Sequence, residues 1–182
     1  MSTFTTARGT IAPSATILIR REASGDVAAI EAVTRAAFLS APHTSRTEHH
    51  VVRALRRSGN LAVSLVATVD SDVVGHIAMS PITVSDGSPR WYGLGPLSVE
   101  PLCQKRGIGN QLVEVGLTAL RELGAKGCVV LGDPAYYKRF GFQADVRLVL
   151  PDVPPEYFLV LAFSSDIPSG TVTYHESFLA PR

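Results

Sequence analysis

The feature that most constrains this chain is a predicted strand followed by a glycine-bearing loop and a long helix. Trp91 to Val99 is the predicted strand, and it ends at Glu100-Pro101. After the loop Gln104-Lys105-Arg106-Gly107-Ile108-Gly109, apolar residues recur every three or four positions up to Leu123, and Gly124 is placed to end the helix. Such a junction brings free backbone N–H groups and the positive end of the helix dipole together, so it can bind an anion.

The loop sequence narrows the kind of anion. No G-K-[ST] follows it and no third glycine follows Gly109 at the needed spacing, which disfavours nucleoside triphosphates and dinucleotides. Lys105 and Arg106 add two positive charges, which suit a pyrophosphate or a 3'-phosphate better than a single carboxylate. Taken alone, the two glycines would equally fit a junction that needs them only for tight packing.

The periodicity of the remaining chain predicts a mixed α/β domain. Two helices are expected at about 27–38 and 47–58, with Arg53, Arg56 and Arg57 of the second in solvent. The other expected elements are strands at 17–20, 61–69, 73–80, 128–131, 146–150, 158–163 and 170–174 and a short helix at 135–140. A bulge is expected near Gly93 and Gly95-Pro96. Three antiparallel strands before a crossover helix fit a doubly wound parallel sheet poorly.

Composition favours one domain that is neither basic nor membrane-embedded. The chain has 182 residues, 46% of them hydrophobic, and a formal net charge of +1. We therefore expect a disordered lead-in at 1–15, a single domain at 16–182, and no nucleic-acid partner. The apolar stretches are too short to span a bilayer, and the lead-in has no secretory apolar core, so no membrane association is expected.

The two cysteines indicate a cytoplasmic protein. Cys103 and Cys128 have neither CxxC spacing nor a dense cysteine framework, which favours reduced thiols over a disulfide. No His or Cys spacing typical of metal ligands occurs, so no metal is expected. Cys103 lies beside the loop, but no adjacent base that would activate its thiol is evident, which disfavours a covalent intermediate on this residue.

Two motifs resemble those of the GNAT (GCN5-related) N-acetyltransferase superfamily. The segment from Leu97 to Leu123 is similar to the acyl-CoA-binding motif Q/R-x-x-G-x-G/A at every fixed position, and Tyr137-Lys138-Arg139-Phe140-Gly141-Phe142 resembles the later Y-x-x-x-G-F motif. Gly75-His76-Ile77, Ser80-Pro81 and the stretch from Leu131 to Tyr137 resemble the YhbS-like subgroup. The resemblance extends from Ile19 to Phe178. It implies an α/β (α+β) GNAT fold, in which helices flank a mixed, mostly antiparallel sheet with a splayed strand pair.

The resemblance implies an acyl-CoA-dependent N-acyltransferase that moves an acetyl or short acyl group directly to a primary amine. Acetyl-CoA would be the acyl-donor co-substrate. The backbone of Leu97, Ser98 and Val99 would pair with the pantetheine arm. Its backbone N–H groups would also stabilise the thioester oxyanion. The residues expected to hold the pyrophosphate are Gln104, Lys105, Arg106, Gly107, Ile108, Gly109 and Asn110. Asp133 and Tyr136 are further candidates for cofactor binding.

The resemblance also assigns a general acid. Tyr137 would donate a proton to the departing thiolate, the alternative being a tyrosine that only packs its ring. Tyr136 could be confused with it, because adjacent helical residues point about 100° apart and only one should face the sulfur. Glu100 and His76 are candidates for the general base. The alternatives are a solvated turn residue for Glu100, a structural histidine for His76, and a water relay in place of both.

The acceptor is expected to be a small-molecule or peptide amine, and no residue pattern narrows it further. A homodimer through the apolar region from Tyr157 to Phe178 fits the resemblance. The alternative function is a non-catalytic acyl-CoA sensor or interaction domain, which would keep the loop and lack turnover.

Overall fold

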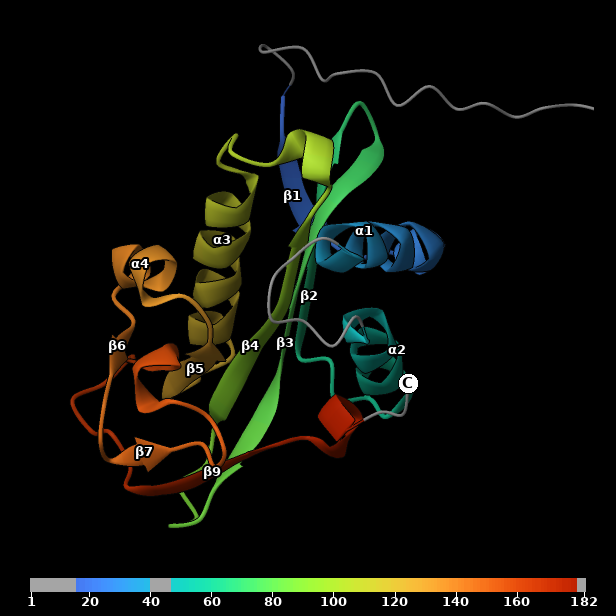
Figure 1. The fold of residues 1–182 in the computed structure, drawn as a ribbon. Helices are drawn as coiled ribbons and strands as arrows, with labels where there is room; N and C mark the ends of the chain where they lie inside the picture. Colours follow the sequence, from blue (N-terminus) through green and yellow to red (C-terminus); the bar gives the residue numbers. More distant parts are fainter. Residues whose placement is uncertain (1–15, 40–46, 180–182) are drawn as a thin grey trace, which may run out of the picture.

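A twisted central sheet with helices on both faces forms the frame of the protein (Figure 1). The structure is a computed structural model and describes residues 16–39 and 47–179. The disordered lead-in expected at 1–15 lies outside the described residues. No helix in the described part of the chain is long and apolar enough to cross a membrane.

The strands and helices follow the expected order closely. The strands are β1 Leu18–Arg21, β2 Val63–Val69, β3 Asp72–Val84, β4 Trp91–Val99, β5 Gly127–Leu131, β6 Gln143–Ala144, β7 Leu148–Val149, β8 Phe158–Ala162 and β9 Gly170–Tyr174. The helices are α1 Val27–Leu39, α2 Glu48–Arg57, α3 Ile108–Glu122 and α4 Pro134–Tyr137, with short 3₁₀ turns that include Pro101–Cys103, Lys138–Phe140 and Glu176–Leu179. The expected mixed, mostly antiparallel sheet is confirmed.

The one parallel pair along the main path of the sheet marks its centre. The order is β1-β2-β3-β4-β5-β8-β6, and every neighbouring pair is antiparallel except β4 and β5. That pairing stops at Leu94 opposite Val130, although β4 continues to Val99 beside β3. The two strands therefore separate after Leu94, as the splayed pair implied by the resemblance would.

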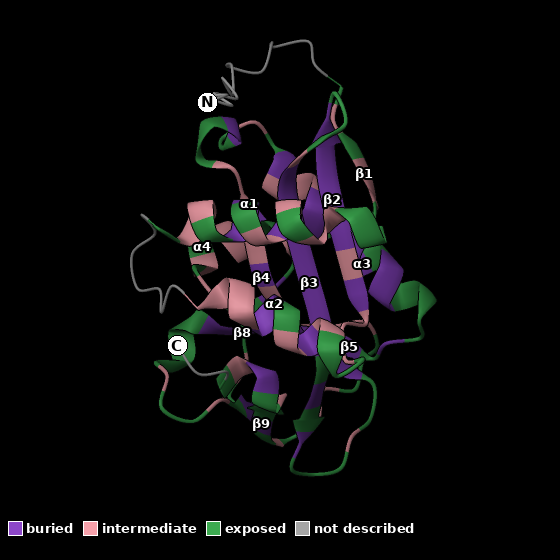
Figure 2. Cartoon of the chain, turned by 90° about the vertical axis from the view of Figure 1, so that its right-hand side faces the viewer, coloured by how far each residue is buried: buried purple, intermediate pink, exposed green. Residues whose placement is uncertain are grey.

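The two faces of the sheet are covered by different helices. Figure 1 shows α3 and α4 on one side and α1 and α2 on the other, and Figure 2 shows α1 and α2 lying across the strands. A large apolar cluster beneath α3 contains Leu112, Leu120 and Val130. A smaller cluster beneath α1 and α2 joins Ile30 and Val52 to the sheet. Burial of these side chains supplies the main favourable free energy of folding.

Three local predictions need correction, and the bulge is confirmed. β3 continues past Pro81 to Val84, because Pro81 is exposed and the next three residues pair with β9. Arg56 is not a solvated residue, since its guanidinium makes two hydrogen bonds of 2.8 Å to Glu22. The two-residue strand β6 was not predicted. The bulge lies on β4, where Gly95 and Pro96 together oppose the single residue Ala78 on β3.

Candidate functional site

A cavity of about 540 Å³ opens where α3 begins. Its walls come from the end of β4, the loop before α3, the C-terminal end of α1, and α4 with the turn after it. The lining residues are Ala37, Phe38, Leu97, Val99, Cys103, Gln104, Lys105, Gly107, Ile108, Gly109, Asn110, Tyr136 and Arg139. We call this space the cradle cavity. It gathers nine of the twelve residues expected to bind the cofactor.

The floor of the cradle cavity is shaped by two left-handed residues. Lys105 has φ 62° and Gly107 has φ 79°. A Cβ atom at Gly107 would meet no atom within 4 Å, so the backbone there is open to a ligand. Helix α3 starts with the hydrogen bond from the Gln111 N–H to the Gly107 carbonyl, at 3.1 Å. The N–H groups before Gln111 have no partner within the helix, which is the arrangement that binds phosphate.

The opposite wall of the cavity comes from α4 and the turn after it. The Tyr136 hydroxyl lies 2.8 Å from the position that a Cβ atom at Gly109 would take, so only glycine leaves room for it. Arg139 donates from Nε to the Tyr136 carbonyl at 2.9 Å, and its Cζ lies 4.9 Å from the Tyr136 ring centroid. The site prediction omitted Arg139, although it lies within the second motif. Its guanidinium adds a positive charge to the cavity.

Three expected cofactor residues do not line the cradle cavity. Ser98 is buried on the other face of β4, where its hydroxyl lies 3.2 Å from that of Thr34. The Asp133 carboxylate instead caps α4 by accepting from the Ala135 N–H at 2.8 Å. Arg106, the third, is also absent from the lining. Ser98 and Asp133 therefore act on the site indirectly, because they help to position β4 and α4.

The adjacent tyrosines point into different surroundings. Their rings are perpendicular, with centroids 5.0 Å apart. Tyr136 faces the cradle cavity, whereas the Tyr137 ring packs over Gly132 and edge-to-face against Phe142 at 5.8 Å. Burial raises the pKa of Tyr137, with Tyr136 and Cys128 adding to the effect. The Tyr137 phenol therefore stays protonated at neutral pH and is able to donate a proton.

Of the two base candidates, His76 is fully buried. Its Nε2 lies 2.9 Å from Ser64 Oγ, and Ser64 donates in turn to Glu22. Burial lowers the pKa of His76 to about 4; nearby Glu22 works against this and Arg56 adds to it. A neutral, enclosed imidazole of this kind is poorly suited to take a proton from an ammonium group.

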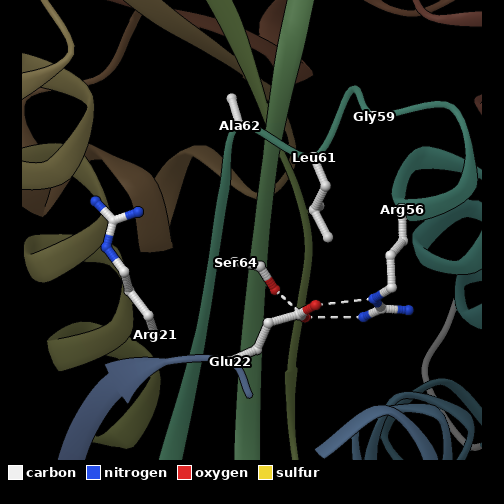
Figure 3. Close-up of a pocket in the computed structure, with 7 residues that line it drawn as sticks. All are labelled: Arg21, Glu22, Arg56, Gly59, Leu61, Ala62 and Ser64. Carbon is white, nitrogen blue, oxygen red and sulfur yellow. Dashed lines mark hydrogen bonds and ion pairs between the residues drawn. The ribbon is translucent and has the colours of Figure 1, made fainter. Parts of the chain in front are cut away.

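Glu22, which is linked to His76 through Ser64, lines a second cavity of about 270 Å³ (Figure 3). Figure 3 shows the Glu22 carboxylate between the Ser64 hydroxyl and the Arg56 guanidinium. The lining residues are Arg21, Glu22, Arg56, Gly59, Leu61, Ala62 and Ser64. No residue is shared with the lining of the cradle cavity, so His76 belongs to a polar network at a different place on the sheet.

Glu100, the other base candidate, lies where β4 gives way to the turn Pro101–Cys103. Its N–H donates to the Val74 carbonyl at 2.9 Å. It lies six positions after Leu94, where β4 and β5 part, which is about 20 Å along an extended strand. Glu100 therefore lies at the cradle end of β4.

Both cysteines are buried and neither is in a disulfide, and burial raises the pKa of the Cys128 thiol. Across residues 16–39 and 47–179, no group of three or more His, Cys, Asp or Glu side chains is placed to hold a metal ion.

Comparisons with known proteins decide the family. A sequence model of the acetyltransferase (GNAT) domain matches residues 60–144. The N-acetyltransferase YhbS of Escherichia coli strain K12 is 38% identical over 170 residues, which cover 89% of this chain and 98% of that protein. This chain belongs to the GNAT family of acetyltransferases.

Two solved GNAT structures resemble the whole fold. A GNAT family acetyltransferase from Brucella melitensis, solved in complex with acetyl-CoA, is 45% identical with a TM-score of 0.81, covering 90% of this chain and 98% of its own. YhbS from Escherichia coli, solved in complex with CoA, is 35% identical with a TM-score of 0.83, covering 93% and 96%. The GNAT acetyltransferase assignment made from the two motifs is confirmed.

Proposed function

We propose that this GNAT acetyltransferase binds acetyl-CoA in the cradle cavity and transfers the acetyl group directly to a primary amine. The observation that carries the proposal is the loop before α3, where Lys105 and Gly107 have left-handed backbone conformations and line an open cavity at the start of the helix. Relatives solved with acetyl-CoA and CoA support this choice of ligand. The acceptor is a small-molecule or peptide amine.

Different residues of the cradle cavity bind different parts of the ligand. The backbone from Gly107 to Asn110 and the Lys105 side chain bind the pyrophosphate, because they combine N–H donors with positive charge. Beyond Leu94, β4 has no β5 partner, so the edge from Leu97 to Val99 can pair with the pantetheine amides. The Gln104 amide donates to the Val99 carbonyl at 3.1 Å and holds the loop against this edge.

Tyr137 is the proton donor in this proposal. Transfer needs a neutral amine to attack the thioester and a proton for the departing thiolate. Tyr137 stays protonated because burial raises its pKa, whereas the Tyr136 side chain lines the cradle cavity. Water removes the surplus proton of the amine, since His76 is enclosed and Glu100 lies at the far end of β4.

The test measures release of free thiol from acetyl-CoA with a panel of primary amines. Tyr137→Phe should lower kcat about 100-fold, the usual contribution of a general acid, and leave the Kd for CoA within about twofold. Tyr136→Phe is the matched control, because it removes the neighbouring hydroxyl from the cradle cavity and should leave kcat within a few-fold.

Two outcomes would overturn this assignment. If an amine is acetylated and Tyr137→Phe turns over at the wild-type rate, Tyr137 is not the acid. If CoA binds but no amine in the panel is acetylated and Tyr137→Phe changes nothing, the chain is better described as an acyl-CoA sensor.

A further inference from the structure

The Tyr174 hydroxyl is enclosed by protein and has no hydrogen-bond partner among the residues that the structure describes. Tyr174 ends β9, opposite Ile82 on β3. An unpaired buried hydroxyl destabilises a fold, so buried polar groups are nearly always paired with protein, water or ligand. The absence of a protein partner here points to a group that arrives from outside the chain.

The ring of Tyr174 takes the space of a missing side chain on β4. A Cβ atom at Gly93 would overlap the Tyr174 Cε1 atom, so the ring can lie there only because residue 93 is glycine. Gly93 pairs with Val129 of β5, and the next pair, Leu94 with Val130, is the last before the strands separate. The phenol oxygen is two bonds from Cε1. It therefore lies close to the start of the gap between β4 and β5.

Tyr137 approaches the same region from the other face of the sheet. Its ring belongs to the apolar cluster beneath α3, whereas the Tyr174 ring belongs to the cluster on the opposite face with Val129 and Trp91. Burial raises the pKa of Tyr174, and ionised Cys128 and Tyr137 would raise it further. Tyr174 is thus held as a protonated phenol, a hydrogen-bond donor.

We propose that the Tyr174 hydroxyl donates a hydrogen bond to the acyl carbonyl oxygen of the thioester bound where β4 and β5 part. This inference rests on the proposed acetyl-CoA binding and adds a second phenol with a different task. Tyr137 supplies a proton to sulfur, and Tyr174 stabilises charge on oxygen. The Tyr174 ring lies against Gly93, at the end of β4 away from the pyrophosphate-binding loop.

The chemistry of transfer gives the Tyr174 hydroxyl a role at a defined moment. The amine lone pair forms the new C–N bond, and the carbonyl π electrons move onto oxygen, where the Tyr174 O–H stabilises them. The electrons return as the C–S bond breaks, and the bond pair leaves on sulfur. Sulfur takes the proton of Tyr137, and the surplus proton of the amine passes through water to restore that phenol.

Ser80 offers a competing explanation for the unpaired hydroxyl. It pairs with Gly93 across β3 and β4, so the two residues share a face of the sheet. Its Oγ is also buried, with no hydrogen-bond partner within residues 16–39 and 47–179. A water molecule between Ser80 and Tyr174 would satisfy both hydroxyls and would make them purely structural. Ser80→Ala is therefore the matched control.

The experiment compares acetyl-CoA with CoA, which lacks the acyl carbonyl. Calorimetric titration should show Tyr174→Phe losing affinity for acetyl-CoA about fivefold, as expected for one hydrogen bond, with the Kd for CoA unchanged. The infrared stretch of a ¹³C-labelled acetyl carbonyl should move to higher frequency in Tyr174→Phe. Ser80→Ala should alter neither readout. With an acceptor in hand, kcat of Tyr174→Phe should fall about 100-fold.

The outcomes separate this inference from the proposed function. If Tyr174→Phe binds both ligands like the wild type and the carbonyl stretch does not move, the hydroxyl does not contact the thioester. If Tyr174→Phe and Ser80→Ala lower the melting temperature alike without changing either readout, a structural water explains both hydroxyls and the inference fails. If Tyr174→Phe weakens binding of acetyl-CoA but not of CoA, and the protein acetylates no amine, the Tyr174 contact is supported and only the transfer reaction is overturned.

Discussion

The proton arrangement around His76 follows from its neighbours. Ser64 has one hydroxyl proton and donates it to Glu22, so the Nε2 atom of His76 carries hydrogen and donates to Ser64. The Nδ1 atom then keeps its lone pair and has no partner in the described part of the chain. A second proton would place a charge in a fully buried ring, which explains why the pKa of His76 falls to about 4.

This depressed pKa makes stability depend on pH. Because His76 titrates near 4 in the folded state and near 6.5 when unfolded, the unfolded chain binds more protons between these values. The contribution of the neutral ring is complete above pH 6.5 and is lost as the pH falls toward 4. Its slope reaches about 1.4 kcal/mol per pH unit. His76→Gln keeps a donor for Ser64 and does not titrate.

Urea unfolding at pH 7, 6 and 5 measures the effect. The free energy of unfolding of His76→Gln should fall less steeply than that of the wild type over this range. Both proteins retain the same carboxylates, so the difference between the two slopes isolates His76. Parallel slopes would show that His76 has the same pKa in the folded protein as in the unfolded chain.

At the residue scale the sequence predicts the chemical role of a side chain better than it predicts the surroundings of that side chain in the fold. The motif spacing identifies Tyr136 and Tyr137 as a pair of which one faces the ligand site, but only the packing of α4 shows which one. Tyr137 fits over Gly132 and against Phe142, and this leaves Tyr136 for the cavity. The buried state of His76 depends on α1, β2 and β3 together, so no local pattern contains it.

At the scale of elements, the N-terminus of α3 is the most sharply specified part of the site. Gly107 adopts φ 79°, which costs any other L-residue about 1–2 kcal/mol, and its missing side chain would project into the cradle cavity. Gly107→Ala should therefore lower both stability and CoA affinity, the latter about tenfold, as expected when a hydrogen bond to a charged phosphate is weakened.

Gly59 provides a matched control for Gly107. It has φ 72° and equally open surroundings, but it lies at the second cavity, away from α3. Gly59→Ala should lose about the same stability, roughly 1–2 kcal/mol, and bind CoA like the wild type. Chemical denaturation and calorimetric titration of both variants measure the two effects. Equal loss of CoA affinity in both would mean that the Gly107 effect is only general destabilisation.

Elements with strong periodicity were predicted almost to the residue, and those that depend on partners were not. Helix α3 and strand β5 follow the expected ranges because amphipathic or apolar runs and flanking glycines define them locally. β3 runs beyond Pro81 because β9, almost ninety residues later, supplies its partner. Strand β6 has two exposed residues and exists only through pairing with β8.

At the scale of the whole molecule, the last strand ties distant parts together. β9 pairs with β3, and the turn Glu176–Leu179 that follows it contacts α2. His175 between them lies 3.1 Å from the Asn60 amide and hydrogen-bonds to Ser177. The pairing of β9 with β3 brings Tyr174 over Gly93, a contact spanning eighty-one residues of sequence. Neither motif extends to this segment, so Tyr174 could not be predicted as a site residue.

Ligand binding should stabilise the whole fold, because the cradle cavity joins α1, β4, α3 and α4. A ligand present at 100 times its Kd adds about 2.7 kcal/mol to the free energy of unfolding. For a protein of this size that corresponds to a rise in melting temperature of about 5–10 °C. Acetyl-CoA and CoA should both produce it in a thermal-shift assay. ATP and NAD should produce little, because the loop lacks the G-K-[ST] and third-glycine features of their binding sites. A larger rise with ATP or NAD than with acetyl-CoA would identify the cavity as a nucleotide site and overturn the proposed function.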